Sequence, residues 1–100
     1  MTNDDKITKA FYAIKYALNV PEADVINPRR EPAKMTARRL FIVLLRRDGV
    51  SFTDIAEVLK CSITNVSRMY SRAAWLLSAS TLTKVKYDSV SGYYEALKSL

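Results

Sequence analysis

The sequence contains no histidine and one cysteine, Cys61. The absence of histidine excludes histidine-based catalysis and histidine-ligated zinc, and one cysteine is too few for a thiolate zinc site. A lone cysteine also excludes an internal disulfide bond and suits a reducing cytoplasm. We therefore expect a cytoplasmic protein that holds no metal ion and no other cofactor.

Glycine and long apolar runs are also scarce. The only two glycines are Gly49 and Gly92, which argues against tight hairpins and a glycine-rich phosphate loop. The longest apolar run, Leu40 to Leu45, has six residues, far fewer than a membrane-spanning helix needs. The polar start, MTNDDKITK, lacks the character of a signal peptide. With 49% apolar and 26% charged residues, the composition fits one soluble globular domain.

Acidic residues are nearly missing from one window. From Arg29 to Arg47 there are seven basic residues and one acidic residue, Glu31, so this window accounts for the whole net charge of +6. Its first part, NPRREPAK, has two prolines that cannot lie inside a helix, so we expect Arg29 and Arg30 on an exposed loop. A solvated helix face usually mixes signs, whereas a run of one sign indicates phosphate binding. On the segment after the loop, we expect the first arginine pair, Arg38 and Arg39, to be functional. We expect the second pair, Arg46 and Arg47, to be partly ordinary surface.

Apolar residues recur at helical spacing along most of the chain. Steps of four, three and four in the first segment predict a helix from about Asp4 to Asn19. Pro21 is typical of the first turn of a short helix. A third segment, about Ala33 to Asp48, has the same spacing and ends at Gly49, a usual residue after a helix. The fold class is therefore all-α, a compact helical domain of about five or six helices.

The pattern loosens after Leu77. In SASTLTKVKYD we expect only a linker or a short extended piece, and the last twelve residues, SVSGYYEALKSL, predict a short final helix. We therefore divide the chain into a helical domain, residues 1–78, and a linker with a C-terminal helix, residues 79–100. That helix offers four residues for packing on the domain, for a homodimer or for a protein partner: Tyr93, Tyr94, Leu97 and Leu100.

Two apolar-periodic segments flank a small polar cluster in GVSFTDIAEVLKCSITNVSRMY, residues 49–70. Ser51 and Ser62 have the character of helix caps, which predicts a helix of about two turns, a short turn and a second helix. Ala56 is small where two steeply crossed helices of a helix-turn-helix must touch. The turn position that is typically glycine is Lys60, where positive φ costs on the order of 1 kcal/mol; a phosphate contact offsets that cost, or the turn is of another type. An ordinary helical hairpin in a bundle is the alternative interpretation.

The outward side of the second predicted helix is small or basic, apart from Ile63. An ordinary surface has no need of an exposed isoleucine, but in DNA this side chain can contact a thymine methyl group. Arg68 can bridge a guanine edge or a phosphate.

Residues 7–76 resemble the C-terminal DNA-binding domain of the bacterial replication initiator DnaA. The likeness rests on the turn PEADVI, the basic loop NPRREPAKMTARR, the long segment after it and the opening GVSFTDIA, and it extends to the tail YDSVSGYYEALKSL. The resemblance implies a Trp-repressor-like helix-turn-helix fold. It also implies minor-groove and phosphate contacts by the basic loop, which carry over to Arg29, Arg30, Lys34 and Arg38. The family's recognition helix opens with D-H-T-T-V and here the stretch is S-I-T-N-V, so we expect another target sequence. We expect no ATPase module of that family before this domain, and so no origin melting powered by ATP by this chain alone.

The stretch DGVSFTDIAEVLKCSITNVSRMYSRA also resembles the promoter-reading module of sigma factors. The basic loop fits the initiator better, the helix-turn-helix fits the sigma module slightly better, and both families imply duplex DNA with a helix in its major groove. The residues that match the sigma pattern are Gly49, Ser51, Ile55, Ala56, Leu59, Ser62, Val66, Arg68, Arg72 and Ala73.

These features predict sequence-specific binding of double-stranded DNA by a small stand-alone regulator of transcription or replication, of phage or mobile-element type, associated with the nucleoid. The competing interpretation is an adaptor whose basic face binds an acidic protein partner or the replication initiator. We expect no enzyme, because Asp54 and Glu57 have the spacing of a solvated face and no nucleophile–base pair is present. Neither a membrane nor a small-molecule substrate is expected. The predicted DNA-binding residues are Arg29, Arg30, Lys34, Arg38, Arg39, Ser51, Lys60, Ser62, Ile63, Thr64, Asn65, Ser67, Arg68, Ser71 and Arg72.

Overall fold

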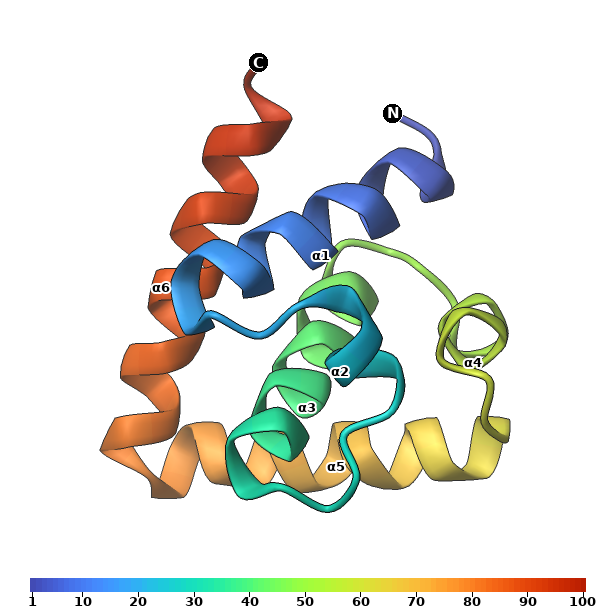
Figure 1. Ribbon diagram of the computed structural model, residues 1–100, viewed down its shortest axis with the longest axis vertical. Coiled ribbons are helices and arrows are strands. Elements are labelled where there is room, and N and C mark those ends of the chain that lie inside the picture. Colours follow the sequence, from blue (N-terminus) through green and yellow to red (C-terminus); the bar gives the residue numbers. More distant parts are fainter.

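Six α-helices and no strand make up the structure, a computed structural model that describes residues 1–100 (Figure 1). The all-α prediction and the expected number of helices are confirmed. None of the helices combines the length and the apolar character that crossing a membrane requires. In chain order the helices are α1 (Asn3–Leu18), α2 (Glu22–Ile26), α3 (Pro32–Arg47), α4 (Phe52–Leu59), α5 (Ile63–Ala79) and α6 (Thr81–Lys98).

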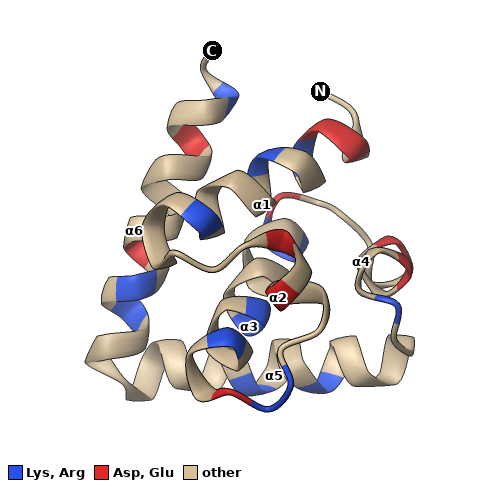
Figure 2. Ribbon diagram, viewed as in Figure 1, with Lys and Arg blue, Asp and Glu red and all other residues tan.

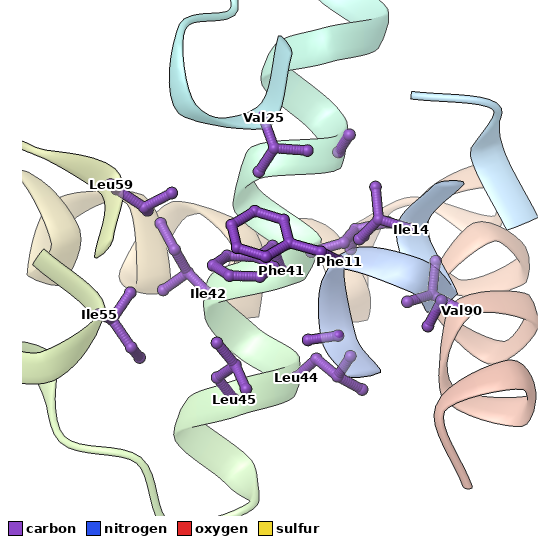
Figure 3. Packing of buried hydrophobic residues seen from close by; sticks show 14 of the residues in the cluster. Phe11, Ile14, Val25, Phe41, Ile42, Leu44, Leu45, Ile55, Leu59 and Val90 are labelled. Carbon is purple, nitrogen blue, oxygen red and sulfur yellow. The ribbon is translucent and has the colours of Figure 1, made fainter. Parts of the chain in front are cut away.

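The central helix is α3, which contacts all five other helices. Its run Leu40–Leu45 is buried throughout, including Ile42 and Val43, which a single apolar stripe at helical spacing would leave out. Both are buried because α3 is surrounded by neighbours at this level, and such a helix is apolar on every side. Figure 3 shows Phe41 against Phe11 of α1, with ring centroids 4.4 Å apart. The core therefore lies around the middle of α3.

The helix ends follow local sequence signals. Gly49 follows α3 with φ +90°, and the N–H of Val50 donates to the carbonyl oxygen of Leu45 over 3.0 Å. A residue with positive φ at this position is the common end of a helix, and glycine adopts it with least strain. Pro21 stands just before α2 as its N-cap rather than in its first turn.

The prediction of a linker after Leu77 is wrong. Residues Thr81–Lys98 form one continuous helix of 18 residues, and its N-cap Ser80 follows α5 directly. The helix packs along α1 and buries Val90 and Tyr94. Residues 81–98 are thus part of the same packed body as the other helices.

A polar network ties α6 and α1 to the end of α3. The Tyr94 hydroxyl donates to Asp48 Oδ2 over 2.5 Å, and Lys98 Nζ donates to both carboxylate oxygens of Asp48 over 3.2 Å. Lys6 Nζ of α1 donates to the carbonyl oxygen of Asp48 over 2.8 Å. Burial raises the pKa of the Asp48 carboxyl, but the hydrogen bonds from Tyr94 and Lys98 outweigh it and hold the pKa below its ordinary value. Burial, together with the Asp48 carboxylate, raises the pKa of Tyr94.

Helix α5 crosses one end of the molecule, and both chain termini lie at the opposite end (Figure 1). Of its 17 residues only Val66 and Ala73 are fully buried. One long side of α5 is therefore open to solvent along its whole length.

Candidate functional site

Three residues, 60 to 62, join α4 to α5. Lys60 has φ 57° and ψ 44°, the left-handed conformation, and the N–H of Cys61 donates to the Ala56 carbonyl oxygen over 3.1 Å. The turn is therefore of the type that usually has glycine, the same type that Gly49 makes after α3. A residue with a Cβ costs about 1–2 kcal/mol more than glycine in this conformation. Lys60 is exposed and forms no ion pair, so no contact within the protein offsets that cost.

The loop between α2 and α3 holds two more left-handed residues. Arg29 and Arg30 have φ 50° and 61°, and both are exposed, as predicted. Besides these two, Asn19 and Lys60 are the other non-glycine residues with positive φ. Asparagine tolerates this region well, so the three unfavourable cases are all basic residues. Backbone strain of this kind persists only where the surrounding structure holds it, and it clusters at functional sites.

One open cleft of about 620 Å³ joins the loop to the turn, because Arg29 and Lys60 both line it. Lys34 also lines the cleft, but its Nζ is 3.0 Å from Glu31 Oε2 and 3.4 Å from Asp24 Oδ2. The hydrogen bond to Glu31, supported by Asp24, raises the pKa of Lys34. Lys34 thus has its charge balanced within the protein, while Arg29 and Lys60 form no ion pair with the acidic residues that line the same cleft, Glu22, Asp24 and Glu31.

The arginines of α3 are mostly engaged in internal contacts. Arg38 Nη1 donates to the carbonyl oxygen of Ile26 over 3.1 Å, and its Nε is buried without a partner. Arg38 therefore fixes the end of α2 to α3. Arg39, the other member of the first pair, is half-buried and forms no hydrogen bond or ion pair. The second pair lies over aromatic rings, with Arg46 Cζ 4.8 Å from the Phe52 centroid and Arg47 Cζ 5.1 Å from the Tyr87 centroid.

The start of α5 presents small polar side chains and one apolar side chain. Ser62 caps the helix, since its Oγ accepts from the N–H of Asn65 over 3.1 Å. Ser51 caps α4 in the same way, and its Oγ accepts from the N–H of Asp54 over 3.1 Å. Ile63 is 50% exposed although it follows the cap directly. Ser67 is half-buried. The other predicted residues of this stretch are exposed: Ser62, Thr64, Asn65, Arg68, Ser71 and Arg72.

These parts form one surface, which we call the basic face and define by Arg29, Arg30, Lys60, Arg68 and Arg72 together with the start of α5. Its basic residues lie on the α2–α3 loop, on the turn before α5 and along α5, whereas α2 and α4 carry acidic residues (Figure 2). The face holds no deep pocket of its own beyond the cleft at its rim. Its open, exposed form suits contact with another surface better than enclosure of a small molecule.

The sequence prediction left one residue of this surface out. Trp75, the only tryptophan, is 57% exposed and follows Arg68 by seven positions, which places both on one side of α5. The Arg72 guanidinium lies over its ring, with Cζ 5.2 Å from the centroid. Its spacing from Arg68 and Arg72 was the signal that could have identified it.

Comparisons with protein-family models, with curated protein sequences and with solved structures find no match to this chain. No group of three or more histidine, cysteine, aspartate or glutamate residues is placed to hold a metal ion. The basic face is therefore the feature from which a function is inferred.

Proposed function

We propose that this protein binds double-stranded DNA in a sequence-specific manner through a helix-turn-helix formed by α4 and α5. The first half of α5 enters the major groove, and the α2–α3 loop grips the backbone or the adjacent minor groove. One observation carries the proposal. Arg29, Arg30 and Lys60 stand on strained left-handed backbone, and their exposed side chains form no ion pair or hydrogen bond beside the start of α5.

Phosphate binding explains that arrangement. Glycine at these three positions would relieve the strain, so their cationic side chains need a use outside the fold. Arginine and lysine bind phosphate oxygens through charge-assisted hydrogen bonds. A duplex offers phosphates in rows on both sides of each groove, which matches cations at two separate places on one surface.

The start of α5 suits contact with base edges. Its small side chains allow a close approach to the groove floor, and the partial positive charge at the helix N-terminus favours the nearby phosphates. Ile63 has the exposure and the apolar surface to contact a thymine methyl group. Arg68 is exposed and unpaired, so its guanidinium is available for a guanine edge.

Other predicted residues take supporting roles in this proposal. Lys34 and Arg38 hold α2 and α3 together through the contacts to Asp24, Glu31 and Ile26, and so keep the loop in place. The hydroxyls of Ser51 and Ser62 accept the capping bonds and keep their own protons free to donate to phosphate.

The resemblance to the C-terminal domain of DnaA and to the sigma-factor module supports the same docking. We infer a small regulator of transcription or replication, of phage or mobile-element type. The stretch S-I-T-N-V at the start of α5 predicts a target sequence other than the initiator's own. Selection from random duplexes, read by sequencing, identifies that target.

The test replaces both loop arginines, Arg29→Ala with Arg30→Ala, in the full chain. Because both side chains are exposed, the stability should change by no more than about 0.5 kcal/mol. Affinity should fall for the selected and for random duplexes alike, and the slope of log K against log salt should shrink by up to about two units. The control, Lys9→Ala with Lys15→Ala on α1, removes the same charge away from the basic face and should keep the slope.

An unchanged slope in the loop variant would show that the loop does not touch DNA. Equal affinity of the wild-type protein for every duplex would remove sequence specificity from the proposal. Binding to an acidic protein with no binding to duplex DNA would favour the adaptor instead.

A further inference from the structure

Trp75 is exposed where the fold has no need of it. Its side chain is 57% exposed and belongs neither to the core cluster nor to the apolar residues packed against that cluster. Burial of an indole is among the largest apolar gains available to a protein, and here most of that gain is absent. The packing of α5 thus gives no reason for tryptophan at this position.

The contact of Trp75 with Arg72 supplies a reason. The guanidinium carbon of Arg72 lies 5.2 Å from the ring centroid, within the range of a cation–π contact, about 6 Å. Arg72 forms no ion pair with a carboxylate, and the one aromatic ring that its guanidinium contacts is that of Trp75. A guanidinium that stacks by its face keeps its N–H groups free at its edge, and these bind phosphate oxygens in pairs. The ring therefore favours one position of this cation, while the N–H donors of Arg72 have no partner within the protein.

The place of the pair along α5 is informative. Arg72 follows Ile63 by nine residues, which is about 13 Å along a helix axis. The major groove of B-DNA is about 12 Å wide. Nine residues are also about two and a half helical turns, so Arg72 leaves α5 on the side opposite Ile63. When Ile63 lies against the base edges, Arg72 is thus about one groove width along the helix and at the other edge of its exposed side, where its guanidinium can reach the phosphates that border the groove.

We propose that Arg72 is a phosphate contact at the edge of the groove and that Trp75 is the positioning residue that holds its guanidinium there. This inference depends on the proposed function, because it requires a duplex beside α5. It extends the interface to the second half of α5, where the partner chemistry is the phosphodiester backbone and not the bases.

Four variants of the full chain test the pair: Arg72→Ala, Trp75→Leu, Trp75→Phe and the double variant Arg72→Ala with Trp75→Leu. Arg72→Ala should lower the salt slope by about one unit, on selected and random duplexes alike. Trp75→Leu should lower affinity about two- to fivefold, the share expected of an exposed cation–π contact. Trp75→Phe retains a ring and should stay close to the wild-type affinity. The double variant should bind no more weakly than Arg72→Ala alone, since the two residues act through one contact.

The single tryptophan gives a second readout. Because no other tryptophan contributes, the emission of the wild-type protein should change when duplex is added, with the same midpoint as the affinity measurement. All variants should melt at nearly the wild-type temperature, since both side chains are exposed.

Unchanged affinity of Trp75→Leu would overturn the positioning role. Additive losses in the double variant would also overturn it, because Trp75 would then act independently of Arg72. If the loop variant loses affinity while Arg72→Ala does not, the duplex binds the basic face but stops short of Arg72, and only this inference fails. Absence of salt-dependent duplex binding by the wild-type protein would remove the proposed function and this inference together.

Discussion

Lys60→Gly should make the protein more stable and a weaker DNA binder at the same time. Lys60 has φ 57° and ψ 44° after α4, where a Cβ costs about 1–2 kcal/mol. Glycine removes that cost but loses about 0.5–1 kcal/mol more backbone entropy on folding. The expected net gain is about 0.5–1 kcal/mol, which raises Tm by about 2–8 °C in a domain of this size. No ion pair is lost, because Lys60 forms none.

The expected loss of DNA affinity comes from removal of the positive charge of Lys60. If Lys60 contacts one phosphate, its loss should lower the slope of log K against log salt by about one unit on random duplexes. Thermal melting followed by circular dichroism gives Tm, and fluorescence anisotropy with a labelled duplex at several salt concentrations gives the slope. Lys60→Ala is the matched control, since it removes the charge and keeps the strain. It should show the same loss of slope without the rise in Tm.

Two results would refute the reasoning, and they refute different parts. A Tm below wild type for Lys60→Gly would show that the left-handed turn is not strained by the lysine side chain. A wild-type slope for both variants would show that the Lys60 ammonium does not face the DNA backbone, whatever the stability.

Three further predictions address the interface and the fold. Arg68→Ala should flatten the base preference at one or two positions of the selected site by about 1–3 kcal/mol, and an equal loss on every sequence would make Arg68 a phosphate contact instead. Asp48→Asn should lower the free energy of unfolding at neutral pH by about 1.5–3 kcal/mol, because hydrogen bonds to a charged group are lost. The pKa of Asp48 is lowered in the folded protein, so the carboxylate contributes stability above its unfolded value near pH 4 and loses it as pH falls through the folded-state pKa; denaturation at a series of acidic pH values should show this loss in wild type and not in the variant. Gly92→Ala should raise stability by about 0.5–1 kcal/mol, since no atom lies within 4 Å of the added Cβ, whereas Gly49→Ala, at φ +90°, should lower it.

The helices that sequence spacing predicted well are those with one dense apolar side. Helix α1 was predicted within a residue of its bounds, and the two helices around Lys60 were predicted with their caps Ser51 and Ser62. The first half of helix α6 was missed because its apolar residues do not form one inward-facing side of a helix. Leu82 and Val85 are 65% and 58% exposed, so periodicity gave no inward stripe there.

Contacts between distant residues account for the remaining gaps. Arg38 looked like a free cation in the sequence, but its partner is the backbone oxygen of Ile26, which no side-chain pattern reports. The pairing of Lys34 with Asp24 depends on how α2 lies against α3. The strain at Arg29 and Arg30 is a property of φ, which the flanking prolines do not determine. These features appear only when the helices are placed in space.

The position of the two termini has a practical consequence for measurement. Both ends lie away from α5 (Figure 1), so a short tag on either end can anchor the protein to a sensor chip with α5 pointing into the flow. The same arrangement allows a donor dye on either end and an acceptor on a DNA end to report approach of the duplex without obstructing it. Attachment at the N-terminus and at the C-terminus should then return the same dissociation constant, because neither linker has to pass the basic face.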